Sequence, residues 1–292
     1  MATADYSDLP ILDPHDLSCM RLSSDPATPI EHACRDGPLS TVQAMVADQT
    51  CTPAFLHRSL TFALGAGHED IAHYLLEAGA PIVRLTPVNI FRAASDRHLP
   101  LFRLLSLHGW SPQGFWDDGS LLTVRVITNK PLLRWLLNQG VDPNAGASDP
   151  SRRSALELVA GNGDFETVRL LLDAGADVQQ GVPLHVAAAA CPPGTDAGRN
   201  PIPPTREFDT ARIPTMTLLV ERGAKVNQSQ EARLMAPRYA IVYAVMAGAV
   251  ERVRWLLAHE ADPEVKGAFG SAYDYAQSRG SDEIRSVLAE GV

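Results

Sequence analysis

A short apolar phrase that ends in glycine recurs along this chain, and it restricts the possible folds more than any other feature. The clearest copy is TVRLLLDAGADV at residues 167–178. Similar phrases are HYLLEAGAPI at 73–82, RWLLNQGVDP at 134–143, TLLVERGAKV at 217–226 and RWLLAHEADP at 254–263. The copies are typical of an amphipathic helix that ends in a left-handed C-cap, with glycine at the cap in all of them except the last, which has Glu260 there. A single helix end has no reason to recur, so the repetition predicts a repeating architecture.

A second recurring phrase precedes the first and carries small residues on a short helix. Its copies begin at Thr28, Arg58, Val88, Gly119, Ser154, Val182, Tyr239 and Ser271. Most of these starts lie 28 to 35 residues apart, which is the period of a solenoid. One unit cannot bury its own apolar face, so neighbouring units must supply the core. We therefore expect an all-α solenoid of about eight helix-turn-helix repeats joined by finger loops.

The repeat pattern resembles that of the ankyrin-repeat family. The resemblance rests on SALELVAGNGDFETVRLLLDAGADV at 154–178 and HRSLTFALGAGHEDIAHYLLEAGAPI at 57–82, and it is weakest in the fourth unit, around LLTVRVITNKP. It implies an ankyrin-like repeat domain over residues 27–292, with atypical end units. It also implies a non-catalytic scaffold or adaptor that recognises a protein or peptide partner through a concave groove.

Charge and composition exclude several other classes of function. The net charge of −9 and the pI near 5.4 argue against nucleic-acid partners and anionic membrane surfaces. No apolar run approaches the roughly 20 residues that a membrane span needs. The four cysteines show no metal-binding spacing and are typical of a reduced, intracellular protein. We expect a monomer in the cytoplasm or the nucleus.

Two segments depart from the repeat. Residues 191–212, CPPGTDAGRNPIPPTREFDTAR, form a proline-rich insertion in the sixth unit. The insertion reads either as a flexible, extended loop or as a lid or docking segment, and the first alternative predicts that deleting 193–210 leaves folding intact. Residues 1–26 are the second departure, read either as a cap on the first repeat or as a disordered leader.

A search for chemistry finds no catalytic, cofactor-binding or metal-binding residues. The sequence has no G-x-S-x-G, Walker or HExxH motif. The resemblance gives His185, in VPLH, a role in hydrogen bonding between repeats. It also gives the finger residues Asn144 and Asn227 a weak similarity to positions that some ankyrin-like proteins present for hydroxylation.

Candidate partner contacts come from the resemblance, which places them on finger tips and on the residues that follow the alanine pair. The middle units present apolar side chains there, and the finger QGFWDDG adds two aromatic residues. The expected partner-binding residues are Phe115, Trp116, Val126, Ile127, Asn162, Met246, Arg153 and Arg238. Two alternatives remain. In the first, the insertion or the long finger at 227–238 covers the groove. In the second, this protein is an enzyme or a biosynthetic accessory protein that uses the groove as a small-molecule pocket.

Overall fold

The structure is a computed structural model, and it describes residues 28–48, 51–83, 85–112, 124–145, 153–195, 202–230, 237–268 and 270–290. These residues are predominantly helical, and their only β-type pairing is an isolated bridge between Gly267 and Gly270. The expectation of an all-α solenoid is confirmed.

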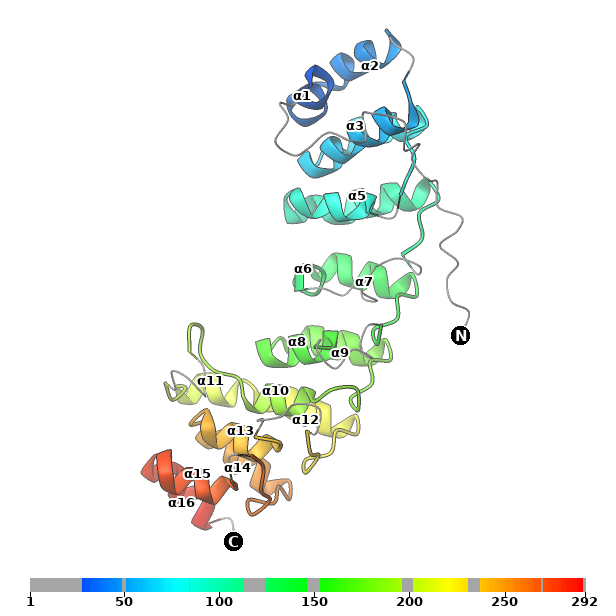
Figure 1. The fold of residues 1–292 in the computed structure, drawn as a ribbon. Helices are drawn as coiled ribbons and strands as arrows, with labels where there is room; N and C mark the ends of the chain where they lie inside the picture. Colours follow the sequence, from blue (N-terminus) through cyan, green and yellow to red (C-terminus); the bar gives the residue numbers. More distant parts are fainter. Residues whose placement is uncertain are drawn as a thin grey trace. The chain divides into compact units, whose positions relative to one another are not determined.

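The helices follow one another in pairs, and each repeat contributes a first and a second helix (Figure 1). The first helices are α1 (Pro29–Asp36), α3 (Pro53–Ala66), η3 (Thr86–Arg92), α6 (Val124–Ile127), α8 (Ala155–Asn162), α10 (Pro183–Ala188), α13 (Ala240–Met246) and α15 (Ala272–Arg279). The second helices are α2 (Leu39–Ala47), α4 (Glu69–Glu77), α5 (Ser95–Leu107), α7 (Lys130–Asn138), α9 (Phe165–Asp173), α12 (Ile213–Glu221), α14 (Val250–Ala258) and α16 (Asp282–Glu290). The insertion adds α11 (Arg206–Thr210) between α10 and α12.

The chain divides into two compact units. Unit 1 comprises 1–121 and 128–141, and unit 2 comprises 122–127 and 142–292. The division falls within the fourth repeat, whose first helix α6 belongs to unit 2 and whose second helix α7 belongs to unit 1. Within each unit, first helices pack on first helices, as α8 does on α10 and α10 on α13.

Local sequence rules explain where the helices begin and end. Ser154 caps α8, since its Oγ accepts a hydrogen bond from the Glu157 backbone N–H at 3.1 Å, while the Glu157 carboxylate accepts one from the Ser154 N–H at 2.8 Å. The predicted left-handed glycines after the second helices are confirmed, with φ from 83° to 101° at Gly79, Gly109, Gly140, Gly175 and Gly223. Glu260 holds the corresponding place after α14 with φ of 63°, which costs a residue with a Cβ conformational energy.

Within each unit, the core lies between stacked repeats and is made by the residues that recur. Leu171 and the small residues Ala63, Ala160 and Ala244 are fully buried. The third repeat differs, because its first helix is a 3₁₀-helix and Ala93 is only half-buried. The Asn89 side chain donates to the carbonyls of Leu85 and Thr86, which lie four and three residues earlier and would otherwise serve an α-helix.

The fingers of unit 2 are joined by asparagine side chains. Asn144 Nδ2 donates to the Gly175 carbonyl at 2.9 Å, and Asn144 Oδ1 accepts from the Asp177 N–H at 2.8 Å. Asn227 repeats this arrangement with the Glu260 carbonyl at 2.8 Å and the Asp262 N–H at 2.9 Å. Both asparagines therefore use their amide groups to hold one finger to the next.

The insertion is not the flexible, extended loop that one reading predicted, at least over residues 202–212. Thr205 caps α11 by accepting a hydrogen bond from the Phe208 N–H at 3.2 Å, and α11 packs on α14. Asp209 of α11 is only 2% exposed. This part of the insertion is folded structure, so the prediction that 193–210 can be deleted without harm does not stand.

Two of the predictions lie outside the described residues. These are the leader at 1–26 and the aromatic pair Phe115 and Trp116. Among the helices that the structure describes, none has both the length and the apolar character needed to cross a membrane.

Candidate binding site in unit 2

A small cavity of about 70 Å³ lies in unit 2 between the first helices α8, α10 and α13 and the finger that precedes α13. Its lining combines apolar and polar side chains, namely those of Arg153, Glu157, Val182, His185, Val186, Ala189, Gln230 and Tyr243. The helix α10 supplies His185 and Val186 from consecutive positions, and Ala189 follows at its C-terminal end. The cavity thus lies where three successive repeats meet.

His185 is the most deeply buried ionisable residue of the lining, with 2% of its surface exposed. Its Nε2 lies 2.9 Å from both the Gln228 and the Arg238 carbonyl oxygens. Carbonyl oxygens only accept hydrogen bonds, so Nε2 carries the proton and donates it to them. Burial lowers the pKa of His185 below its ordinary value and outweighs the two carbonyl hydrogen bonds and the nearby Glu157 carboxylate, which act in the opposite direction. The imidazole is therefore neutral at pH 7.

The other ring nitrogen of His185 is a buried acceptor. Because the ring is neutral and Nε2 holds the proton, Nδ1 carries a lone pair, and it has no hydrogen-bond partner among the residues that the structure describes. Position 182, the N-cap of α10, holds valine, whereas the N-caps of α8 and α15 are serines that complete capping boxes. Val182 directs its own N–H to Glu157 Oε1 at 3.1 Å. The missing hydroxyl at the N-cap explains why Nδ1 is unpaired.

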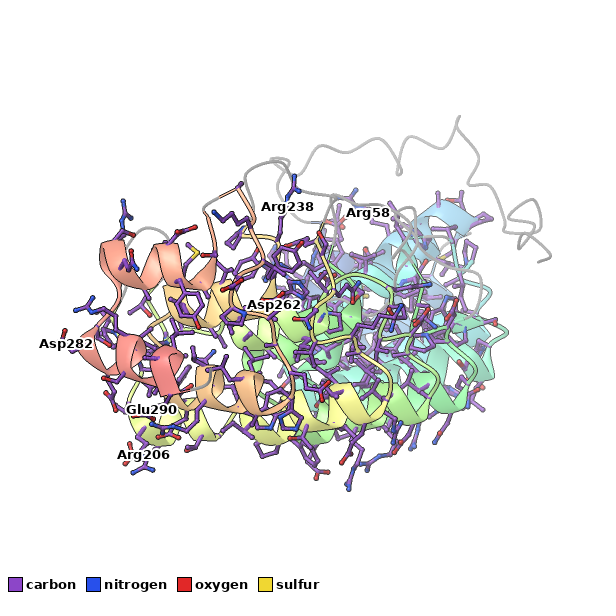
Figure 2. All side chains as sticks on the ribbon, turned by 90° about the horizontal axis from the view of Figure 1, so that it is seen from below. Arg58, Arg206, Arg238, Asp262, Asp282 and Glu290 are labelled. Carbon is purple, nitrogen blue, oxygen red and sulfur yellow. The ribbon has the colours of Figure 1, made fainter. Side chains whose placement is uncertain are left out.

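Two exposed arginines are linked to the cavity, Arg153 by lining it and Arg238 through its carbonyl, which accepts a hydrogen bond from His185. Arg238 lies one residue before the Tyr239 N-cap of α13. Arg238 has φ of 69°, in the left-handed region that residues other than glycine rarely adopt. Its carbonyl is held there by His185 Nε2 and by the Gln230 N–H at 2.8 Å. Figure 2 shows the Arg238 side chain projecting from one edge of unit 2, opposite to the edge that carries Arg206.

Some of the predicted contact residues of unit 2 are exposed at the surface, and others are buried. Val126 and Ile127 are 0% and 2% exposed, so their expected role as surface anchors is wrong. They belong to α6, a helix of four residues that packs on α8, and their side chains fill the interior of unit 2. Asn162 is exposed at the end of α8 and Met246 is half-buried at the end of α13. Neither residue lines the cavity.

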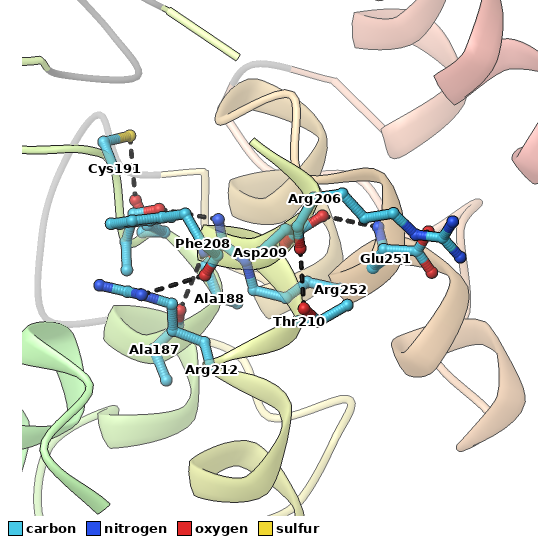
Figure 3. Close-up of polar contacts among 12 residues, drawn as sticks. Ala187, Ala188, Cys191, Arg206, Phe208, Asp209, Thr210, Arg212, Glu251 and Arg252 are labelled. Atoms are coloured by element: carbon cyan, nitrogen blue, oxygen red, sulfur yellow. Dashed lines mark hydrogen bonds and ion pairs between the residues drawn. The ribbon is translucent and has the colours of Figure 1, made fainter. Parts of the chain in front are cut away.

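A buried polar network beside α10 was missed by the sequence reasoning (Figure 3). Arg252 of α14 is fully buried and pairs with Asp209 of the insertion, with 2.6 Å between Nε and Oδ1. A signal was present in the sequence, since Arg252 stands four residues before the buried Leu256 and therefore shares the apolar face of its helix. A cation at such a position needs an acidic partner nearby.

The described residues include no group of three or more histidine, cysteine, aspartate or glutamate side chains that could hold a metal ion. Cys34 is buried, and burial raises the pKa of its thiol to about 11. Cys34 therefore stays protonated at pH 7 and lacks the reactivity of a thiolate.

No protein-family model matches the sequence, and no curated protein matches it. Among solved structures, the chain is similar to the crystal structure of the human ASB11 ankyrin repeat domain, with a TM-score of 0.44 and 19% sequence identity over 91% of this chain and 98% of that chain. A likeness of this degree does not assign the chain to a family.

Proposed function

We propose that this protein is a non-catalytic binding module that recognises an acidic segment of a partner protein at the unit 2 cavity. The single observation that carries the proposal is Arg238. Its backbone is held in an unfavourable left-handed conformation by two hydrogen bonds, one of them from His185 of the cavity lining, and its side chain is exposed. Local strain of this kind persists where the surrounding structure enforces it, and it concentrates at functional sites.

Charge supports an acidic partner. Neither Arg153 nor Arg238 has a carboxylate within ion-pair distance among the described residues, whereas Arg169, Arg222 and Arg254 do. The protein as a whole carries a net charge of −9, but neither of these two guanidinium groups is neutralised by a described carboxylate, so both can meet an acidic group of a partner. A guanidinium is the side chain best suited to carboxylate recognition, because it can donate two parallel hydrogen bonds.

The size of the cavity supports a side chain as its occupant rather than a small molecule. Small-molecule pockets usually enclose about 300–1,000 Å³. The cavity encloses about 70 Å³ and is lined by Val182, Val186 and Ala189 on its apolar side. One short side chain of a bound segment fits this space, while the rest of the segment would lie across the rim near the arginines.

The test is selection of peptides from a random library displayed on phage, with the full-length protein as bait. We expect the wild-type protein to enrich peptides that contain Asp or Glu. The double variant Arg153→Glu/Arg238→Glu should bind these peptides about tenfold more weakly in calorimetry, because each rim contact is worth up to about 1 kcal/mol.

The matched control is Arg103→Glu/Arg134→Glu, which makes the same change in net charge on the exposed surface of unit 1. It should bind like the wild type. Enrichment of peptides without acidic residues, or equal losses in both double variants, would overturn the proposal.

A further inference from the structure

The helix α10 is held from two sides. His185, Val186 and Ala189 line the cavity. The carbonyls of the neighbouring Ala187, Ala188 and Ala190 point instead to the buried guanidinium of Arg252. A helix of six residues has few internal hydrogen bonds, and its last carbonyls need donors from elsewhere. The position of α10 therefore depends on Arg252.

Arg252 supplies hydrogen-bond donors to the carbonyls at the C-terminal end of α10. Its Nη1 donates to the Ala187 carbonyl at 3.1 Å and to the Ala188 carbonyl at 2.7 Å, and its Nη2 donates to the Ala190 carbonyl at 2.8 Å. Its Nε donates to Asp209 at 2.6 Å. A guanidinium has five N–H donors, so these four hydrogen bonds leave little freedom for any other arrangement of the side chain.

Asp209 reaches this position because the insertion folds back onto α14. Its Oδ1 accepts from Arg252, and its Oδ2 accepts from the Glu251 N–H at 2.6 Å, close to the N-terminus of α14 (Figure 3). Ala249, the N-cap of α14, offers no side-chain hydrogen bond, so Asp209 replaces the missing cap. Asp209 is also the nearby negative charge for Arg212, whose guanidinium lies 3.3 Å from the centre of the Phe208 ring.

We infer that Asp209 and Arg252 are positioning residues for the unit 2 cavity, so that the docked insertion controls whether the cavity can accept a partner side chain. A buried arginine without its carboxylate is strongly disfavoured and moves toward water. Arg252 would then release the carbonyls of Ala187, Ala188 and Ala190 at the C-terminal end of α10, and His185, Val186 and Ala189 would shift with the helix. The inference rests on the proposed function for its effect on binding, but the coupling of the insertion to α10 is independent of it.

The first test is the isosteric variant Asp209→Asn, studied at a temperature where circular dichroism shows it folded. The readouts are the NMR signal of the His185 ring proton on Nε2 and the hydrogen exchange of the α10 amides. We expect the ring signal to shift or broaden, and the Ala189 amide to exchange about tenfold faster, because α10 loses the donors that hold it. The control Asp173→Asn, which removes the exposed partner of Arg222, should change neither readout.

A second variant covers the case in which Asp209→Asn fails to fold. Asp209→Leu/Arg252→Met replaces the buried pair with apolar side chains of similar volume, and such replacements preserve folds. The carbonyls of Ala187, Ala188 and Ala190 still lack the donors of Arg252 in this variant, so the His185 signal should remain altered. An unchanged His185 signal and unchanged α10 exchange in a folded variant would overturn the inference.

Peptide affinity separates the inference from the proposed function. If the wild-type protein enriches no acidic peptide but the His185 signal responds to Asp209→Asn, then the proposed function is wrong and the coupling is retained. If acidic peptides bind and Asp209→Asn weakens them about tenfold together with a change at His185, both are supported. If Asp209→Asn leaves peptide affinity and His185 unchanged, the inference is wrong while the binding function stands.

Discussion

The residue at the N-cap of a first helix decides whether the polar groups of its first turn find hydrogen-bond partners. Ser154 and Ser271 exchange reciprocal hydrogen bonds with the acidic residue three positions later. Val182 cannot do this, so His185 Nδ1 stays buried without a donor among the described residues. A buried acceptor without a partner costs about 1–3 kcal/mol. The sixth repeat therefore carries an avoidable destabilisation at its first helix.

We predict that Val182→Thr stabilises the protein. Threonine has nearly the shape of valine, and its hydroxyl at the N-cap can accept from the backbone N–H of His185 and donate to Nδ1. The expected gain is about 1 kcal/mol in the free energy of unfolding, measured by urea denaturation.

The control for this prediction is Val178→Thr, which makes the same exchange at nearly equal burial, 6% exposed against 7% for Val182. Val178 precedes no helix, so its hydroxyl would be buried without a capping role and should destabilise the protein. Equal effects of the two substitutions would contradict the capping explanation.

At the scale of elements, α11 provides a packing contact between repeats that a second helix would be expected to provide. The helix that packs on α14 from the preceding repeat is α11, while α12 packs on α9 and α10. Through Asp209, α11 also supplies the cap of α14 and the negative charge beside Arg252. The insertion thus links the sixth repeat to the seventh.

Deleting 193–210 with a short Gly-Ser link should destabilise the protein by about 3–5 kcal/mol, because it leaves Arg252 buried without its carboxylate. Deleting only 196–200 keeps α11 and Asp209, so the buried ion pair stays intact and the cost should be less than about 1 kcal/mol. Thermal melts and urea denaturation measure both variants. Equal stability of the two deletion variants would show that the ion pair is unimportant.

At the scale of the whole molecule, stability is shared between neighbouring repeats. Leu171 of α9 is fully buried, and α9 packs on both α8 and α12. Leu171→Asp should cost roughly 3–5 kcal/mol, since it buries an unpaired carboxylate and removes apolar contacts. Hydrogen exchange should accelerate in α8 and α12 as well as in α9.

The matched control is Leu107→Asp, since Leu107 is 82% exposed and its replacement should change the stability by less than about 0.5 kcal/mol. Faster exchange confined to α9 after Leu171→Asp would contradict the nearest-neighbour coupling that a solenoid requires.

The order of helices could be predicted from the sequence because local signals set it. The leucine runs, the glycines after the second helices and the small residues of the first helices all act within one repeat. The contact residues could not be predicted equally well. Val126 and Ile127 were expected to follow a first helix, but that helix is only four residues long and includes both of them. The pairing of Asp209 with Arg252 joins positions 43 residues apart, and no periodicity records it.

The buried pair also limits how freely the repeats can be exchanged as modules. A repeat array is usually treated as a set of interchangeable cassettes, because each unit meets its neighbours through similar surfaces. The seventh repeat is not such a cassette, since its Arg252 requires a carboxylate that only the insertion of the sixth repeat provides. Transplanting the seventh repeat into another array would import an uncompensated buried cation. A designer must move 183–258 as one block, so that the carbonyls of α10 and the carboxylate of Asp209 accompany Arg252, or replace Arg252 with an apolar residue at the same time.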